Sequence, residues 1–254
     1  MNGLLLAIGF LTAIPVQTGE ARAGALGQAA RWFPFVGFCL GGVVAGAYWG
    51  LTQFLPPLLV AALTVALWTL LTGGLHLDGL ADCCDGLLAA TTPERRLDIL
   101  RDPHLGAFGA IGLTLFLLAK VAAVSALPSS SFLLAFVSAA TFARWLIVLA
   151  ARPPLARPDG LAAQFVAGLT HETVLLAALL PAALLLVGLF GSWQMLLAAA
   201  LAHPVAFGLV ALARARLGGV TGDVFGLIAE VTELVCLLAF TAHFPSFPSF
   251  PSFP

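Results

Sequence analysis

The sequence predicts an all-α, polytopic integral membrane protein, and two observations support this prediction. Of the 254 residues, 61% are hydrophobic and only 9% are charged, whereas soluble domains carry about 45–50% apolar and about 25% charged residues. The apolar residues also gather in long stretches, each near the roughly 20 residues that a helix needs to cross a bilayer. Backbone groups find no water inside lipid, so these stretches must be helical. A disordered chain and an ordinary soluble domain are therefore excluded.

Seven apolar stretches are the candidate membrane-spanning helices, at residues 33–52, 58–75, 106–127, 132–151, 173–190, 193–212 and 224–243. The apolar run at 3–16 has no Lys or Arg before it, as a signal peptide would require, so we expect a retained short membrane or interfacial helix. Whether this run crosses the membrane is left open. We expect residues 1–243 to form one membrane-embedded domain and the Phe-Pro-Ser repeat at 244–254 to form an extended low-complexity tail.

The connections alternate between short uncharged turns and longer polar segments. Counting spans from residue 33 places the longer segments, 76–105, 152–172 and 213–223, on the same side as residues 17–32. The short turns contain no Lys or Arg, whereas that side holds Arg22, Arg31, Arg95, Arg96, Arg101, Arg152, Arg157, Arg214 and Arg216. Because basic residues mark the cytoplasmic side, we expect the polar segments to face the cytoplasm. Most acids lie there too, which predicts three helical hairpins and a closing helix around one cytoplasmic-side site.

The sharpest motif is His76-Leu-Asp78-Gly-Leu-Ala-Asp82-Cys-Cys-Asp85-Gly86. Its three aspartates stand at i, i+4 and i+7, which places them on one helix face. Like charges at this spacing repel unless a positive charge lies between them. Carboxylate sets of this kind suit Mg²⁺, which usually takes one or two carboxylates plus substrate phosphates and water. The alternative is a solvated helix end just outside the bilayer.

A second acidic cluster lies in the last apolar stretch, where Asp223, Glu230 and Glu233 again share one helix face. An acid within a membrane span costs roughly 2.5–3.5 kcal/mol on insertion scales, so such residues normally face a bundle interior or a watery cavity and have a function. The alternative is that the two glutamates pair with a buried Arg144 for stability alone.

Between the two clusters lies a charged segment whose arginines, Arg95, Arg96 and Arg101, could clamp phosphate oxygens. Asp102 could bind a metal or act as a base, and His104 could bond a phosphate or a ribose hydroxyl. The alternative is a membrane-surface loop with ordinary cytoplasmic arginines. The lone Lys120 is expected to extend toward the far interface.

Several other classes of protein are excluded. With 11 basic and 12 acidic residues, the net charge is only -1, which does not favour nucleic-acid binding. The four cysteines form no Cys-x-x-Cys pair, so a zinc site is not expected. The chain also lacks a phosphate-binding GxxxxGK[ST] or GxGxxG loop and a serine or cysteine nucleophile in a recognisable elbow.

The segment from Gly73 to Gly86, Gly-Gly-Leu-His-Leu-Asp-Gly-Leu-Ala-Asp-Cys-Cys-Asp-Gly, resembles the hallmark of the cobalamin synthase family, the adenosylcobinamide-GDP ribazoletransferases. Three further segments resemble that family, and they are Phe10–Pro15, Arg31–Gly37, and Gly218–Gly226 followed by Glu230 and Glu233. The resemblance covers the chain to about residue 243. It departs at Arg101-Asp102-Pro103, where the family more often has a Lys-Asp-Ser-like sequence, and at His104, which often corresponds to an arginine; the role of His104 therefore carries over less well than that of Asp102.

The resemblance implies the last assembly step of cobalamin (vitamin B12) synthesis in a bacterial inner membrane, with the site facing the cytoplasm. Adenosylcobinamide-GDP would be joined to α-ribazole or its 5′-phosphate, releasing GMP and requiring Mg²⁺. The lipid bilayer is the other expected partner; assembly as a homo-oligomer or with other cobalamin-pathway enzymes is left open.

The resemblance also implies roles for individual residues. The expected metal ligands are Asp78, Asp82, Asp85 and Asp223, and Asp82 is also expected to be essential for catalysis. The expected substrate contacts are His76, Arg95, Arg96, Arg101, His104 and Thr221. The proton of the attacking ribose hydroxyl would go to one of the three remaining acids, Asp102, Glu230 or Glu233.

Two alternatives compete with this interpretation. Asp82-Cys-Cys-Asp85-Gly86 is similar to the opening of the CDP-alcohol phosphotransferase motif, but Ala89-Ala90 replaces the expected Ala-Arg and no downstream GxxxDxxxD follows. A cation-coupled transporter would use Glu230 and Glu233 as its ion site. Transporter sites tend to lie near the midplane between related halves, whereas here the polar residues cluster at the predicted cytoplasmic ends.

Overall fold

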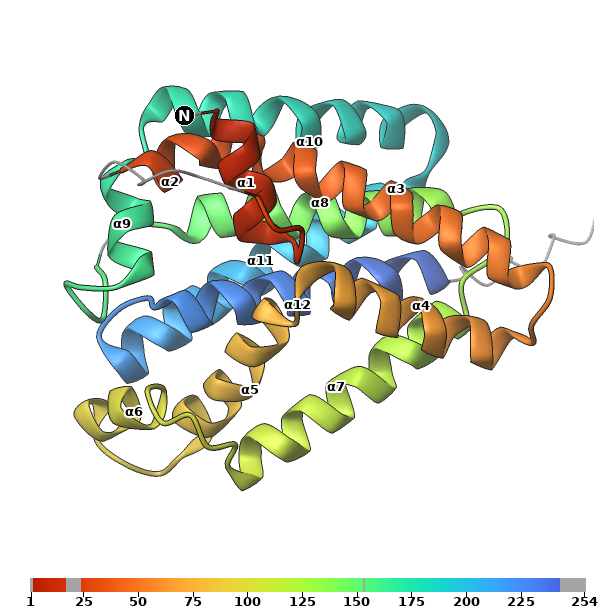
Figure 1. The fold of residues 1–254 in the computed structure, drawn as a ribbon. Coiled ribbons are helices and arrows are strands. Elements are labelled where there is room, and N and C mark those ends of the chain that lie inside the picture. The colour runs from red at the N-terminus through yellow and green to blue at the C-terminus, as the bar shows by residue number, and fades with distance from the viewer. Residues whose placement is uncertain (1, 17–23, 153, 243–254) are drawn as a thin grey trace, which may run out of the picture.

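The computed structural model describes residues 2–16, 24–152 and 154–242, which form helices joined by loops (Figure 1). In chain order the elements are α1 (Gly3–Leu11), α2 (Ala25–Ala29), the 3-10 turn η1 (Ala30–Trp32), α3 (Phe33–Thr52), α4 (Pro57–Thr72), α5 (Leu75–Leu88), α6 (Pro93–Ile99), α7 (Ala107–Ser125), α8 (Phe132–Ala150), α9 (Leu161–Ala167), α10 (His171–Gly191), α11 (Trp193–Leu217) and α12 (Gly222–Thr241). The predicted all-α fold is confirmed, since the only β-pairing in these ranges is an isolated bridge between Leu155 and Val220. The Phe-Pro-Ser tail predicted at 244–254 lies outside the described residues.

The predicted membrane-spanning helices are present. In the described part of the chain, six helices are long and apolar enough to cross a bilayer, namely the continuous run Ala25–Thr52 and α7, α8, α10, α11 and α12. Helices α4 and α5 form a bent pair that would make a seventh span. Helix α1 is only nine residues long, about 14 Å at 1.5 Å per residue, so it is too short to cross about 30 Å of hydrocarbon.

The core of the bundle is built on α8 and α12. Most of the residues in both helices are buried, whereas only a minority of those in α7 and α10 are. The exposed side chains are apolar and large, such as Leu115 and Leu118 on α7 and Leu189 and Phe190 on α10. In Figure 1, α10 lies along one edge of the bundle and α7 along the opposite edge, with α11 and α12 between them. A polar solvent would disfavour these outer faces, so they fit a lipid environment.

A sharp bend after α4 positions the aspartate motif. Helix α4 ends at Thr72, three residues before the end of the predicted stretch 58–75, and the chain turns by 95° into α5. Gly73 and Gly74 make the turn with φ values of 64° and 70°, in the left-handed region that glycine adopts without a steric penalty. The bend sends α5 across α12 instead of along α4, as Figure 1 shows.

Arg96 secures the far end of α5. Its guanidinium Nη1 is buried and donates to the carbonyl oxygens of Gly86 at 2.9 Å and Leu87 at 2.7 Å. Arg216 at the end of α11 also donates to the Leu87 carbonyl. The last carbonyls of a helix lack hydrogen-bond partners within the helix, and here the two arginines donate to these carbonyls. The side chain predicted to clamp substrate thus holds α5 and α6 together.

Candidate active site

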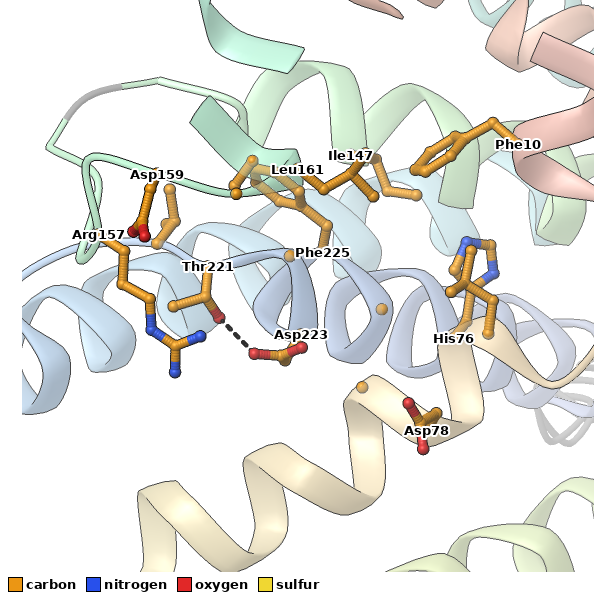
Figure 2. Close-up of a pocket in the computed structure, with 17 residues that line it drawn as sticks. Phe10, His76, Asp78, Ile147, Arg157, Asp159, Leu161, Thr221, Asp223 and Phe225 are labelled. Atoms are coloured by element: carbon orange, nitrogen blue, oxygen red, sulfur yellow. Dashed lines mark hydrogen bonds between the residues drawn. The ribbon is translucent and has the colours of Figure 1, made fainter. Parts of the chain in front are cut away.

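A cavity of about 220 Å³ lies where the first turns of α5 and α12 meet the loop before α9. Three acids line it, and they are Asp78 from α5, Asp159 from the loop and Asp223 from α12. Arg157, His76 and Thr221 add polar groups, and Phe10, Leu161 and Phe225 add apolar ones. The first turns of the two motif helices, far apart in sequence, therefore share one cavity, as Figure 2 shows.

Two glycines allow α5 and α12 to cross in close contact. A Cβ atom on Gly79 would lie 2.8 Å from the backbone oxygen of Asp223, and one on Gly226 would lie 3.0 Å from the backbone oxygen of His76. Helices with small residues at their contact can bring their backbones together. This crossing places Asp78 and Asp223 on the same cavity.

Replacing Gly79 with alanine is therefore expected to lower the thermal stability of the detergent-solubilised protein. The added methyl group would overlap backbone atoms that cannot rotate away, and overpacking typically costs about 1–3 kcal/mol. Gly42→Ala on α3 is the matched control, since nothing lies within 4 Å of its new Cβ atom, and alanine is about 1 kcal/mol better than glycine within a helix. Equal melting temperatures for the two variants would contradict close crossing.

Thr221 orients Asp223 from the start of α12. Its hydroxyl donates to the Asp223 carboxylate oxygen Oδ2 at 3.1 Å and accepts from the Val224 amide at 3.4 Å, as an N-cap residue does. Figure 2 shows the two side chains facing each other beside Arg157. Thr221, predicted as a substrate contact, therefore lines the cavity and also fixes the carboxylate beside it.

The other two aspartates of α5 differ in their surroundings. Asp82 is half-buried, within electrostatic reach of the carboxylates of Asp78, Asp223 and Asp85. Asp85 accepts hydrogen bonds from the backbone amides of Gly106 and Gly109, both at 2.8 Å, so it caps the start of α7. One helix face thus carries Asp78, which lines the cavity, Asp82, which lies within electrostatic reach of it, and Asp85, which fixes α7.

Within the described residues, no group of three or more His, Cys, Asp or Glu side chains converges closely enough to hold a metal ion. The chemistry of the acids nevertheless fits a hard cation, because Asp82 interacts unfavourably with three neighbouring carboxylates. Mg²⁺ needs only one or two carboxylates when substrate phosphates and water supply the remaining ligands.

The segment after α6 reaches the cavity wall. Arg101 lies 3.8 Å from the Asp159 carboxylate, and Arg157 donates to the backbone oxygen of Leu97 at 2.7 Å. Arg95, by contrast, pairs with Asp98 at 3.7 Å on an exposed surface. Arg101 is therefore the predicted clamp that contacts the loop lining the cavity.

Asp102 and His104 form a hydrogen-bonded pair on the surface. The Asp102 oxygen Oδ1 lies 2.6 Å from the His104 ring nitrogen Nδ1 and accepts from the His104 backbone amide at 3.0 Å. Hydrogen bonds from the His104 side chain and backbone lower the pKa of the Asp102 carboxyl group, because they favour its charged form. The carboxylate is therefore ionised at neutral pH and can orient the imidazole.

The two membrane glutamates belong to a buried ion-pair network. The Lys120 Nζ atom on α7 lies 2.7 Å from a Glu230 oxygen and 2.6 Å from a Glu233 oxygen, and Arg144 on α8 contacts the other Glu233 oxygen. The expectation that Lys120 extends toward an interface is wrong: it points into the bundle, 4.6 Å from the centre of the Trp68 ring. Opposite charges on facing helices offset the cost of burying each one.

Sequence reasoning missed part of the cavity. It counted Arg157 and Asp159 only as charges on one side of the membrane, and it did not single out Leu161 or Phe225. The available signal was the placement of segments 76–105, 152–172 and 213–223 on one side, which the structure brings together at this cavity. Sidedness predicts proximity of segments, but it does not predict which side chains meet.

Comparisons with known proteins agree over nearly the whole chain. Residues 3–241 match a family model described as Cobalamin-5-phosphate synthase. The adenosylcobinamide-GDP ribazoletransferase of Desulfitobacterium hafniense is 37% identical over 250 residues, which cover 94% of this chain and 96% of that protein. The protein of the same name from Deinococcus radiodurans is 41% identical over 240 residues, with 93% and 84% covered. The one from Geotalea daltonii is 36% identical over 242 residues, with 92% and 94% covered. No solved structure matches the chain significantly.

Proposed function

The chain belongs to the cobalamin-5-phosphate synthase family, and from this premise we propose that it is an adenosylcobinamide-GDP ribazoletransferase. In the reaction, a ribose hydroxyl oxygen of α-ribazole, or of its 5′-phosphate, forms a bond to the cobinamide-linked phosphorus. The bond from that phosphorus to the bridging oxygen of the pyrophosphate breaks, and GMP leaves with that oxygen. The hydroxyl proton passes to a base.

The observation that carries the proposal is the meeting of the two motif helices. Asp78 and Asp223 share a cavity with Arg157, and Asp82 lies within electrostatic reach of both acids. Transfer at a pyrophosphate needs negative charge to be neutralised as the leaving phosphate departs. Carboxylates beside an arginine supply places for both a cation and a phosphate.

Mg²⁺ fits this set of acids, and we propose that one or two of Asp78, Asp82 and Asp223 hold it, with substrate phosphates and water as the remaining ligands. When bound, the ion would polarise the pyrophosphate and neutralise charge on the leaving group. Asp85 supports the site from a distance through its hydrogen bonds to the start of α7. Arg157, which belongs to the loop before α9, and Arg101, which contacts Asp159 of that loop, would steady phosphate oxygens.

We assign the base to the Asp102–His104 pair. Three acids are predicted from the sequence as possible proton acceptors. Asp102 is exposed to solvent, whereas Glu230 and Glu233 are buried against cations. A carboxylate that orients an imidazole is a familiar device for accepting a proton near neutral pH. The segment carrying the pair adjoins the cavity wall through Arg101 and Asp159.

We place the protein in the bacterial inner membrane with this cavity on the cytoplasmic side. The support is the excess of arginines in the polar segments that surround it. The expected partners are the two substrates and the bilayer.

The test is GMP release by the purified protein in detergent or liposomes, given adenosylcobinamide-GDP and α-ribazole with and without Mg²⁺. We expect release that needs both substrates and stops when a chelator removes the metal. Folded protein that releases no GMP, but accepts CDP-alcohol substrates or moves a cation across sealed vesicles, would contradict the proposal.

A further inference from the structure

A second groove, with a volume of about 500 Å³, lies between α8 and α11, two helices that pack together. It shares no lining residue with the cavity of the candidate active site. Its walls are mainly apolar, with two arginines among them, and the residues that matter here are Leu149, Arg152, Phe207, Val210, Ala211 and Arg214. None of the described residues that line it is acidic. The groove therefore combines an apolar wall with positive charge.

The α11 side of the groove is one face of the helix. Four of its residues stand at i, i+3, i+4 and i+7, namely Phe207, Val210, Ala211 and Arg214, and this spacing places them in one stripe. The seven residues from Phe207 to Arg214 rise about 10 Å along the helix axis. Helix α11 is long and apolar enough to cross a bilayer, and Arg214 lies in its last turn. The stripe thus leads from an aromatic ring within the span to a cation at its end.

The two arginines lie at corresponding ends of the two helices. Arg152 closely follows the end of α8 at Ala150, and both Arg152 and Arg214 are exposed. The count of spans places these ends on the same, predicted cytoplasmic side. The neighbouring Arg216 has another task, because it donates to the carbonyl of Leu87 at the end of α5. The groove therefore has its charge at the level of the lipid headgroups and its apolar wall at the level of the hydrocarbon.

This arrangement favours one class of ligand. Arginine forms strong, often bidentate hydrogen bonds with phosphate oxygens, and basic pockets between membrane helices on the cytoplasmic side bind anionic headgroups. A phospholipid carries its phosphate above its acyl chains, in the same order along the bilayer normal as the arginines and the apolar wall. A soluble phosphate compound would leave the apolar wall unused. A zwitterionic lipid would bring a cation of its own beside the two arginines.

We propose that the groove between α8 and α11 is a binding site for one anionic phospholipid. The phosphate lies between Arg152 and Arg214. An acyl chain lies along Leu149, Phe207 and Ala211. Phosphatidylglycerol has this chemistry. The inference goes beyond the proposed enzymatic function and does not depend on it, since the groove and the cavity of the candidate active site are lined by different residues.

The test is native mass spectrometry of the purified full-length protein in detergent, titrated with phosphatidylglycerol and, for comparison, with phosphatidylcholine. A lysine or arginine close to an anionic lipid surface strengthens binding about 5-fold. We therefore expect Arg152→Gln and Arg214→Gln each to raise the apparent Kd for phosphatidylglycerol about 5-fold, and the double variant to raise it about 25-fold. Arg95→Gln is the matched control, because Arg95 is an exposed arginine of α6 outside the groove. Its affinity should equal that of the wild type.

Ala211→Trp tests the apolar part of the site and leaves both arginines in place. Ala211 is exposed, so an indole ring can fill the groove without displacing a buried side chain, and melting temperatures check that the variant is folded. Its apparent Kd for phosphatidylglycerol is expected to rise about 5-fold or more, because the acyl chain loses its contact with the groove.

Three results would overturn the proposal. Equal affinity for the two lipids, or an equal loss in Arg95→Gln, would show general surface charge and no site. Full competition by glycerol 3-phosphate, with no effect of Ala211→Trp, would assign the arginines to a soluble phosphate compound. A dimer in the spectra that Ala211→Trp dissociates and phosphatidylglycerol does not would assign the groove to a second copy of the chain.

Discussion

Replacing Asp82 with asparagine is expected to reduce the rate of GMP release by about 10³-fold or more, with the protein still folded in the membrane. Asparagine keeps the shape of the side chain and removes its charge, so a cation loses a ligand at the centre of the acidic face. Stabilisation of transition-state charge by a bound metal amounts to several kcal/mol, and each 1.36 kcal/mol corresponds to tenfold in rate. Asp82 interacts with all three neighbouring aspartates, so we expect the largest single effect here.

The matched control is Asp98→Asn. Asp98 lies on α6, where it is exposed and paired with Arg95 at 3.7 Å. The substitution therefore removes the same charge from a surface position. Surface pairs contribute roughly 0–1 kcal/mol, and we expect wild-type turnover from this variant. Rates would be measured across a Mg²⁺ titration, alongside melting temperatures. Asp82→Asn protein that turns over like the wild type would remove Asp82 from the site.

The membrane architecture could be predicted from sequence because its cause is local. A stretch of about 20 apolar residues must form a helix inside lipid whatever its neighbours are, and each of the seven predicted stretches coincides with a helix over most of its length, although 58–75 ends in the bend after α4. The common face of the three α5 aspartates also follows from helix periodicity alone. Periodicity does not predict the different roles of the three aspartates, because the role of Asp85 depends on two amides more than 20 residues further along the chain.

The parts that sequence could not predict depend on contacts between distant segments. Gly73 and Gly74 permit a bend, but its 95° angle is set by what α5 packs against. Lys120 lies 110 residues before Glu230, and no helical spacing links the two. A lone lysine in an apolar helix has two physical outcomes, reaching an interface or finding buried acids, and the choice is made by the facing helix. The cavity at the crossing of α5 and α12 likewise depends on three segments that meet only in the fold.

Replacing Lys120 with methionine is expected to destabilise the folded protein by about 3–5 kcal/mol, the usual cost of leaving a buried charge without its partner. Methionine keeps the length of the side chain, but both glutamate carboxylates would then share the single guanidinium of Arg144. The exposed fraction of the Lys120 side chain is only 4%, so water cannot replace the ammonium group. Thermal inactivation in detergent would register the loss.

The double variant Lys120→Met with Glu230→Gln separates the two roles that the glutamates could have. It removes one positive and one negative charge, leaving Glu233 paired with Arg144, so most of the stability lost in the single variant should return. If the network is structural and the base lies at Asp102, turnover should return together with stability. A double variant that melts like the wild type and yet releases no GMP would make Glu230 the proton acceptor. The comparison works because it restores charge balance without restoring the carboxylate.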